Sequence, residues 1–177
     1  MLNRLHVSAF ELGATALVVA LDQVTKPLVR AKLDLYESVS IVPGFLNLTH
    51  VQNTGAAFGI LNRVDFPLKT PVLIGLAIVA LVSIGVYSMG LPAGQRLARF
   101  GLAVVLGGAI GNLIDRVRTG HVLDFVDVYW RDYHFWAFNV ADAAITIGVA
   151  LLILDLLLER QSDGHDTPAE PADASDT

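Results

Sequence analysis

Four long apolar segments dominate the hydropathy pattern of the chain. They cover about 7–29, 72–91, 96–117 and 139–158. The second of them contains no charged residue and matches the roughly 20 residues that a helix needs to cross a bilayer core. Pro92 and Gly94 follow it and end it. The pattern predicts four transmembrane helices in a single domain over residues 1–160.

The first apolar segment ends in the polar sequence D-Q-V-T-K at 22–26. A basic start before an apolar run is also typical of a cleaved signal peptide. The absence of a small-x-small site with a polar exit argues against cleavage here. Asp22 and Lys26 are four residues apart, so they share a helix face and can pair. Asp22 and Lys26 could be a simple ion pair at the membrane interface, or they could belong to a functional site. The sequence favours neither interpretation.

The segment at 32–69 does not span the membrane. It contains a Pro43-Gly44 turn between two β-prone runs, S-V-S-I-V and F-L-N-L-T-H-V. Open sheet edges do not occur in hydrocarbon, so we expect a small sheet at about 38–60 on the membrane surface. Asn53 and Gly55 follow in a Gly-rich stretch, where Asn53 is also a plain turn candidate and Gly55 allows close approach to the backbone.

Composition agrees with a membrane protein. Hydrophobic residues make up 54% and charged residues 16%, whereas a soluble domain has about a quarter charged residues. The net charge of −5 lies in the tail at 161–177, which has five acids and no Lys or Arg and is predicted to be disordered. The absence of cysteine excludes disulfides, a thiol nucleophile and a thiolate-bound metal.

The third apolar segment combines small residues with a polar end. Asn112 and Arg116 share a face at its end, which leaves Asp115 pointing elsewhere as a structural partner. Small residues let membrane helices approach closely. Those of this segment are Gly101, Gly107, Gly108 and Gly111.

Aromatic residues cluster at 118–137, which is typical of a membrane–water interface. They are Tyr129, Trp130, Tyr133, Phe135 and Trp136. The fourth helix is predicted to begin near Asn139, which is a good N-cap residue.

Four spans place both chain ends on one side of the membrane and gather the conspicuous polar residues on the other. These are Asp22, Lys26, Asn53, Asn112, Arg116, Asp124, Asn139 and Asp142. An ionisable residue inside a membrane segment is a functional-site hypothesis by default. Asp142 is such a residue, at roughly 4–5 Å below the interface from a rise of 1.5 Å per residue.

Asp124 and Asp142 flank the aromatic cluster and are predicted to face each other. Two close carboxylates share a proton, and such a pair suits peptide hydrolysis. Arg116, Asn112 and Asn139 are then candidates to orient a substrate or stabilise charge. The alternative is that Asp124 is an ordinary loop acid and Asp142 a first-turn acid that the helix end satisfies.

Five sequence motifs, in this order, resemble those of the lipoprotein signal peptidases (signal peptidase II). They are D-Q-V-T-K at 22–26, N-T-G-A-A-F at 53–58, G-G-A-I-G-N-L-I-D-R at 107–116, V-L-D-F-V-D at 122–127 and F-N-V-A-D at 138–142. The resemblance covers about residues 5–160.

This resemblance implies an all-α membrane protein with four transmembrane helices, a small β-sheet cradle and an interfacial aromatic loop on the periplasmic side. It implies an aspartyl peptidase of the bacterial inner membrane that needs no metal or other cofactor and does not bind nucleic acid. The implied substrates are prolipoproteins whose lipobox cysteine carries diacylglycerol, and cleavage falls just before that cysteine. Membrane lipid is the other implied partner, and we expect a monomer.

The resemblance also assigns roles to residues. It implies that Asp124 and Asp142 are the catalytic acids. The surface sheet and the aromatic loop, at about 38–60 and 125–137, would hold the substrate. The implied pocket residues are Asp22, Lys26, Asn53, Gly55, Asn112, Arg116 and Asn139.

The distribution of basic residues disagrees with the implied orientation. The site face has eight Lys and Arg residues and the opposite face four, so the positive-inside rule would place the site in the cytoplasm. The resemblance places it on the periplasmic side with both termini in the cytoplasm. We follow the resemblance, because Lys26 and Arg116 are expected in the site and the rule suits short loops.

Three other functions are open to such a chain. A proton-coupled transporter would use Asp22, Asp115 and Asp142 as relays, but its carboxylates should be spaced through the bilayer. A metal-dependent hydrolase is disfavoured because no two of the five histidines, which include His6 and His165, have ligand spacing on one helix. A purely structural membrane protein would not need the gathered Asn, Arg and Asp residues.

Overall fold

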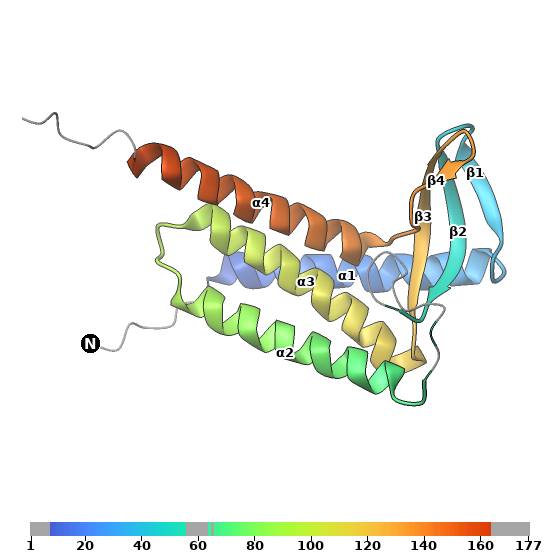
Figure 1. Ribbon diagram of the computed structural model, residues 1–177, viewed down its shortest axis with the longest axis horizontal. Coiled ribbons are helices and arrows are strands. Elements are labelled where there is room, and N and C mark those ends of the chain that lie inside the picture. The colour runs from blue at the N-terminus through green and yellow to red at the C-terminus, as the bar shows by residue number, and fades with distance from the viewer. Residues whose placement is uncertain (1–7, 56–63, 65, 164–177) are drawn as a thin grey trace, which may run out of the picture.

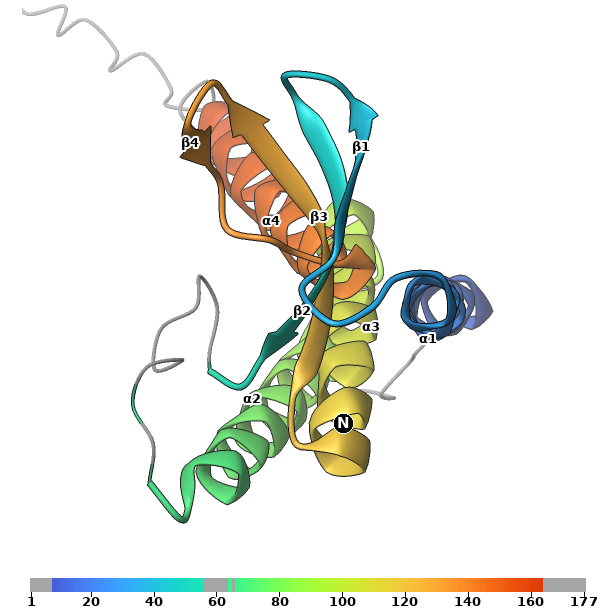
Figure 2. The same ribbon diagram turned by 90° about the vertical axis from the view of Figure 1, so that its right-hand side faces the viewer.

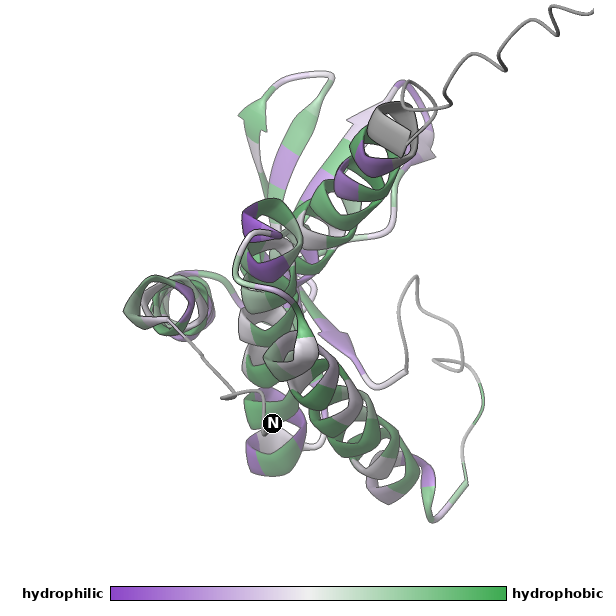
Figure 3. Cartoon of the chain, turned by 90° about the vertical axis from the view of Figure 1, so that its left-hand side faces the viewer, coloured by the Kyte–Doolittle hydropathy of each residue, from purple (hydrophilic) through white to green (hydrophobic). Residues whose placement is uncertain are grey.

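Four long helices form most of the molecule, whose computed structural model describes residues 8–55, 64 and 66–163. They are α1 (Ala9–Lys32), α2 (Lys69–Gly90), α3 (Arg96–Thr119) and α4 (Val140–Asp163), shown in Figure 1. Each is long and apolar enough to cross a membrane. Figure 3 shows hydrophobic residues along most of each helix. The four predicted spans are therefore confirmed.

The helix bounds differ from the prediction most clearly at α1, α2 and α4, and α2 begins three residues early, at Lys69. α1 continues past residue 29 to Lys32, and its last turn carries Arg30 and Lys32, whose positive charges favour a helix C-terminus. α4 continues to Asp163, three residues into the segment that was predicted as a disordered tail. The rest of that tail, residues 164–177, lies outside the described residues, as do His6 and His165.

α3 is the central helix, and α1, α2 and α4 all pack against it (Figure 2). The predicted close packing of its glycines is confirmed, but on two faces. Gly101 and Gly108 face α4, while Gly107 and Gly111 face α1. A Cβ atom on Gly111 would lie 2.6 Å from Oδ2 of Asp22, so only glycine fits there without displacing α1.

A buried ion pair joins the helices at the end of the bundle where α1 begins. Nε and Nη2 of Arg99 donate to the two carboxylate oxygens of Glu11 at 2.7 and 2.8 Å. Nη1 of Arg99 donates to the carbonyl oxygen of Leu91 at 2.9 Å. Glu11 also forms a capping box with Ser8 at the start of α1. One arginine therefore holds α1, α2 and α3 together.

An antiparallel sheet covers the opposite end of the bundle (Figure 1). Its strands, in spatial order, are β1 (Ser38–Val42), β2 (Leu46–Asn53), β3 (Val122–Trp130) and β4 (Tyr133–His134). The start of α1 and the end of α4 lie away from the sheet, as the parity of four spans predicted. The surface sheet predicted at 38–60 is confirmed for β1 and β2, and residues 56–60 lie outside the described residues.

The aromatic loop predicted at about 125–137 is not confirmed as a loop, because residues 122–130 form β3 and residues 133–134 form β4. This segment has a core to pack against, because Leu123 and Phe125 cluster with Val29 of α1 and with Leu33, which follows that helix. Its β-branched and aromatic residues also favour a strand on such a half-buried surface. The aromatic cluster is thus a strand and hairpin that pair with the sheet, not a free loop.

Candidate active site

Asp124 projects from β3, where it pairs in register with Val51 of β2. The residue is 2% exposed, and both of its carboxylate oxygens accept hydrogen bonds. Nδ2 of Asn53, at the end of β2, donates to Oδ2 at 3.0 Å. Nδ2 of Asn139 donates to Oδ1 at 2.6 Å. The side chain is therefore fixed from two directions.

Asp142 is the third residue of α4 and forms a reciprocal capping pair with Asn139. The backbone N–H of Asp142 donates to Oδ1 of Asn139 at 3.0 Å, and the backbone N–H of Asn139 donates to Oδ2 of Asp142 at 3.3 Å. The predicted N-cap role of Asn139 is thus confirmed. From α3, Nδ2 of Asn112 donates to the other oxygen, Oδ1 of Asp142, at 2.7 Å.

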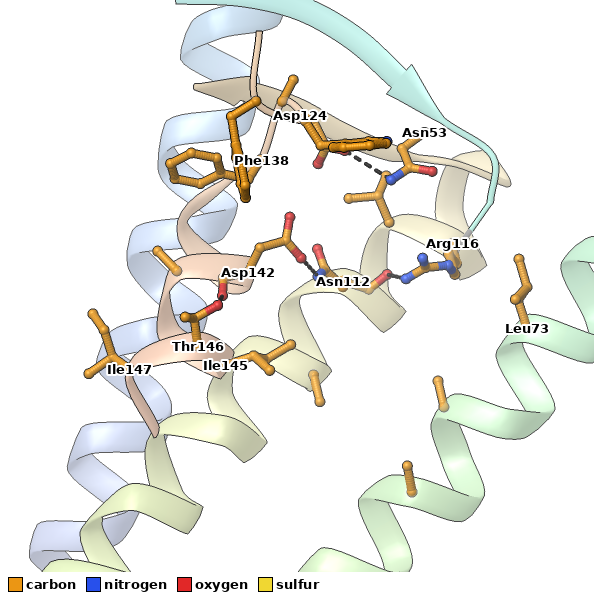
Figure 4. A pocket seen from close by; sticks show the side chains of 18 residues that line it. Asn53, Leu73, Asn112, Arg116, Asp124, Phe138, Asp142, Ile145, Thr146 and Ile147 are labelled. Atoms are coloured by element: carbon orange, nitrogen blue, oxygen red, sulfur yellow. Dashed lines mark hydrogen bonds between the residues drawn. The ribbon is translucent and has the colours of Figure 1, made fainter. Parts of the chain in front are cut away.

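The backbone before α4 brings these groups together. Phe138 and Val126 exchange two backbone hydrogen bonds of 3.0 and 2.8 Å, so the chain runs back along β3 just before the helix begins. Asn139 is the next residue and is completely buried. Its side chain caps the helix that carries Asp142 and also bonds Asp124. Figure 4 shows both carboxyl groups beside the space between β3 and the start of α4.

Asp124 holds its proton more tightly than a solvent-exposed carboxyl group. Burial, and then the nearby charge of Asp142, raise the pKa of Asp124 from 3.8 to about 7. The hydrogen bonds from Asn53 and Asn139 and the positive charge of Lys26 act in the opposite direction. Near neutral pH Asp124 is therefore protonated for a substantial fraction of the time.

A cavity of about 750 Å³ lies beside the two carboxyl groups, between α2, α3 and α4. Asp124, Asp142, Asn53, Asn112 and Arg116 line its polar end. Most of the remaining wall is apolar, with small side chains at Ala77 and Ala80 of α2, Ala109 of α3 and Ala143 of α4. Phe135, Trp136 and Phe138 contribute aromatic side chains from the segment before α4. The cavity can hold an apolar, extended ligand with its polar group near the carboxyl pair.

Gly55 links Arg116 to the same end of the cavity. Its backbone N–H donates to Oδ1 of Asn53 at 2.9 Å, which leaves the amide group of Asn53 directed at Asp124. Nη2 of Arg116 donates to the carbonyl oxygen of Gly55 at 3.0 Å. The predicted shared face of Asn112 and Arg116 is confirmed, since both line the cavity.

Asp22 and Lys26 lie behind the cavity and are not among the residues that line it. Their predicted pairing is confirmed, with Lys26 Nζ 2.7 Å from Oδ2 of Asp22. Lys26 also lies 2.9 Å from Oδ2 of Asp115, which confirms Asp115 as a structural partner. Oδ1 of Asp22 accepts the backbone N–H of Ala141 at 3.1 Å and so holds the first turn of α4. A role in substrate contact stays a prediction for both residues.

Comparison with known proteins agrees with this arrangement. The family model described as signal peptidase (SPase) II matches residues 14–158. The lipoprotein signal peptidase of Geobacter metallireducens is 45% identical over 86% of this chain and 93% of its own length. That of Geobacter sulfurreducens is 48% identical over 81% of this chain and 88% of its own length. The chain belongs to the signal peptidase II family.

Solved structures give the same picture for the fold. A bacterial membrane enzyme solved by the in meso method at 2.3 Å has a TM-score of 0.78 and 32% identity, and the match covers 96% of this chain and 100% of that chain. A second, at 1.9 Å, has a TM-score of 0.75 and 30% identity over 89% of this chain. The family is one of proteases, and the chain is a multi-pass membrane member of it.

Sequence reasoning missed two features of this candidate site. Thr146 lines the cavity one helical turn below Asp142, and its hydroxyl donates to the backbone oxygen of Asp142 at 2.9 Å. The spacing of four residues from Asp142 was the available signal. The second is Gln23, whose amide nitrogen, Nε2, donates to Oδ2 of Asp22 at 3.1 Å and to Oδ1 of Asp115 at 3.2 Å.

Proposed function

We propose that the chain is an aspartyl endopeptidase that removes the signal peptide from diacylglyceryl-modified prolipoproteins, cutting just before the lipidated cysteine. One observation carries this proposal: Asp124 and Asp142, from a strand and a helix distant in sequence, are joined by Asn139 beside one cavity. Family membership supports the substrate class, and the paired carboxyl groups support the aspartyl mechanism.

In the proposed mechanism the carboxyl pair carries one proton. The ionised member takes a proton from a water molecule as the water oxygen attacks the carbonyl carbon of the scissile bond. The protonated member donates a hydrogen bond to the carbonyl oxygen and stabilises the negative charge that develops there. When the C–N bond breaks, a carboxyl group delivers a proton to the leaving nitrogen. The products are the signal peptide with a free carboxyl end and a lipidated cysteine with a free amino group.

The pKa of about 7 for Asp124 suits this use of one shared proton. A group with a pKa near the working pH is present in both protonation states and exchanges its proton readily. Because Asp124 and Asp142 interact, the two titrate as a pair and the proton belongs to both. Their four hydrogen bonds from Asn53, Asn112 and Asn139 keep the carboxyl groups oriented in either state.

The cavity supports a path for the signal peptide from the lipid side. Its apolar wall runs along α2 and α4, on either side of α3, and an apolar signal peptide helix fits such a wall. The small side chains of Ala77, Ala80, Ala109 and Ala143 leave room for the backbone of the substrate near the acids. Arg116, Asn112 and Asn53 line the polar end of the cavity and are candidates to contact peptide carbonyl groups. Gly55 and Asn139 would hold these polar groups in place. Asp22 and Lys26 would support this pocket from behind.

We further propose that the site faces the periplasm across the bacterial inner membrane, with both termini in the cytoplasm. Basic residues engaged inside the protein do not contribute to the positive-inside rule as loop charges do. Lys26 and Lys69 are buried, and Arg116 bonds Gly55 inside the site. Their exclusion weakens the charge excess that would place the site in the cytoplasm.

The decisive experiment uses the purified full chain in detergent with a prolipoprotein that already carries diacylglycerol. Loss of the signal peptide is read as a gel shift for the wild type, Asp124→Asn and Asp142→Asn, with thermal unfolding as a folding control. We expect cleavage by the wild type alone. Cleavage that survives either substitution would refute the carboxyl-pair mechanism. Failure of a folded wild type to cleave would favour the transporter alternative.

A further inference from the structure

A buried cluster of charges lies directly behind the carboxyl pair. Lys26 of α1 contacts Asp22 at 2.7 Å and Asp115 of α3 at 2.9 Å, and the three side chains are 2%, 0% and 9% exposed. None of the three lines the cavity. A lysine in this position is too deeply buried to meet a substrate, so its hydrogen bonds reach the site only through the residue in front of it.

That residue is Asn112. Its oxygen, Oδ1, accepts from Lys26 Nζ at 3.2 Å and from Nδ2 of Asn139 at 3.3 Å. Its nitrogen, Nδ2, is thereby left to donate to Asp142 at 2.7 Å. An amide side chain has one accepting and one donating end, and a turn of 180° exchanges them. The donors behind Asn112 thus decide which end faces the carboxyl group.

We propose that Lys26 is a positioning residue that acts through Asn112, fixing the Asn112 amide so that its N–H group holds Asp142. The inference rests on the proposed function, because it assigns Lys26 a task in the same reaction. It replaces direct substrate contact as the role of Lys26. Without Lys26, only the 3.3 Å bond from Asn139 still holds the Asn112 oxygen. The amide is then less restrained, and a turned amide presents its oxygen to Asp142, which repels the carboxylate.

The charge of Lys26 adds a second effect. It lowers the pKa of Asp124, against burial and the charge of Asp142, which raise it. The groups that act on Asp124 come from every neighbouring element: Lys26 from α1, Asn53 from β2, and Asn139 and Asp142 from the start of α4. Arg116 of α3 lines the same end of the cavity. Removal of the lysine charge therefore raises the pKa of Asp124, and the shared proton dissociates at a higher pH.

The test measures kcat, KM and the pH profile of signal-peptide cleavage for Lys26→Met, Asn112→Ala and the double variant. Misplacement of a reacting group costs about 100-fold in rate, so we expect Lys26→Met to lower kcat on that order with little change in KM. The alkaline limb of the profile should move to higher pH. In the Asn112→Ala background the same substitution should cost little, because the two residues act in series. A raised KM with unchanged kcat, or two losses that multiply fully, would overturn the proposal.

Folding needs its own variant, since Lys26→Met leaves Asp22 and Asp115 buried without their cation. The double variant Lys26→Met/Asp115→Asn keeps the net charge of the cluster and is expected to restore folding without restoring kcat. Glu11→Gln is the matched control, because the Glu11–Arg99 pair also joins α1 to α3 but lies at the other end of the bundle. Glu11→Gln should lower the melting temperature, and the fraction of this variant that is folded should keep the wild-type pH profile.

Asp124→Asn, assayed in parallel, separates the two proposals. If that variant is inactive while Lys26→Met keeps the wild-type kcat and pH profile, the role of Lys26 is refuted and the proposed function stands. If Asp124→Asn still cleaves the prolipoprotein, the carboxyl-pair mechanism fails and the role of Lys26 fails with it.

Discussion

Asn139 and Asp142 cap each other at the start of α4, with hydrogen bonds of 3.0 and 3.3 Å between the backbone of each and the side chain of the other. The same Asn139 side chain donates to Asp124 at 2.6 Å. A capped helix start stabilises a helix in any protein. Here the same residue also links the two carboxyl groups of Asp124 and Asp142. We therefore expect stability to depend on Oδ1 of Asn139, which caps the helix, and cleavage to depend on Nδ2, which bonds Asp124.

Asn139→Ser should separate these two dependences. Serine caps a helix about as well as asparagine but has no amide group to reach Asp124, whereas Asn139→Ala loses both interactions. We expect the alanine variant to be less stable than the serine variant by about 1 kcal/mol. Both should lose cleavage by about 100-fold, because Asp124 is no longer held. Thermal unfolding and the gel-shift assay give the two readings. A serine variant with wild-type cleavage would contradict the role of the Asn139–Asp124 bond.

The pH profile of cleavage should respond to Asn53. The amide of Asn53 stabilises the ionised form of Asp124, whose pKa is about 7. Its removal favours the protonated form, so the pKa rises further and the shared proton is lost only at higher pH. The alkaline limb of kcat/KM for Asn53→Ala should therefore shift upward from about pH 7.

Asn47→Ala is the matched control for that shift. Asn47 also projects from β2 and donates to an aspartate of β3, Asp127, at 3.0 Å, but away from the cavity. Its loss should weaken the sheet by a similar amount and leave the pH profile in place. Equal shifts of the alkaline limb in both variants would show that the shift comes from damage to the sheet and not from loss of the Asn53–Asp124 bond.

Close packing of α3 on α1 leads to a third prediction. A Cβ atom on Gly111 would lie 2.6 Å from Oδ2 of Asp22, whereas one on Gly85 of α2 meets nothing within 4 Å. We expect Gly111→Ala to destabilise the fold by about 1–3 kcal/mol, as overpacking does. It should also lower cleavage, because Asp22 holds the first turn of α4. Gly85→Ala should leave cleavage unchanged and should not destabilise the fold, since alanine favours a helix over glycine by up to about 1 kcal/mol. Thermal unfolding and the cleavage assay measure both effects. A tolerated Gly111→Ala would contradict the packing argument.

Part of this site could be predicted from local sequence, because membrane spans and helix spacing are local properties. Twenty apolar residues define a span, and four-residue spacing paired Asp22 with Lys26 before any tertiary contact was known. Asn139 was likewise predicted as an N-cap from its residue type alone.

The missed parts depend on contacts between distant segments. β3 was interpreted as part of an interfacial loop, because its aromatic residues suit both an interface and a strand. The packing of this segment on Val29 of α1 and on Leu33, just after that helix, is what favours a strand over a loop. The bond between Asn112 and Asp142 depends on the register of α3 against α4, which the glycines at 101, 108 and 148 set by close approach. No spacing along the chain encodes that register.

The fourth prediction concerns stability alone and uses the Glu11–Arg99 pair. Removal of one partner leaves a buried charge without its counterion, which costs about 3–5 kcal/mol. Glu11→Gln keeps the capping box with Ser8, since glutamine serves there as well as glutamate. The loss of stability therefore measures the ion pair alone.

Gln95→Ala is the control. Its 2.6 Å bond to Glu159 at the same end is exposed, and its removal should change the stability by less than about 0.5 kcal/mol. Thermal unfolding in detergent compares the two, with cleavage below the melting temperature expected to stay at the wild-type level. Similar stability of both variants would show that Arg99 finds another partner, and loss of cleavage in a folded Glu11→Gln would show that the two ends of the bundle are coupled.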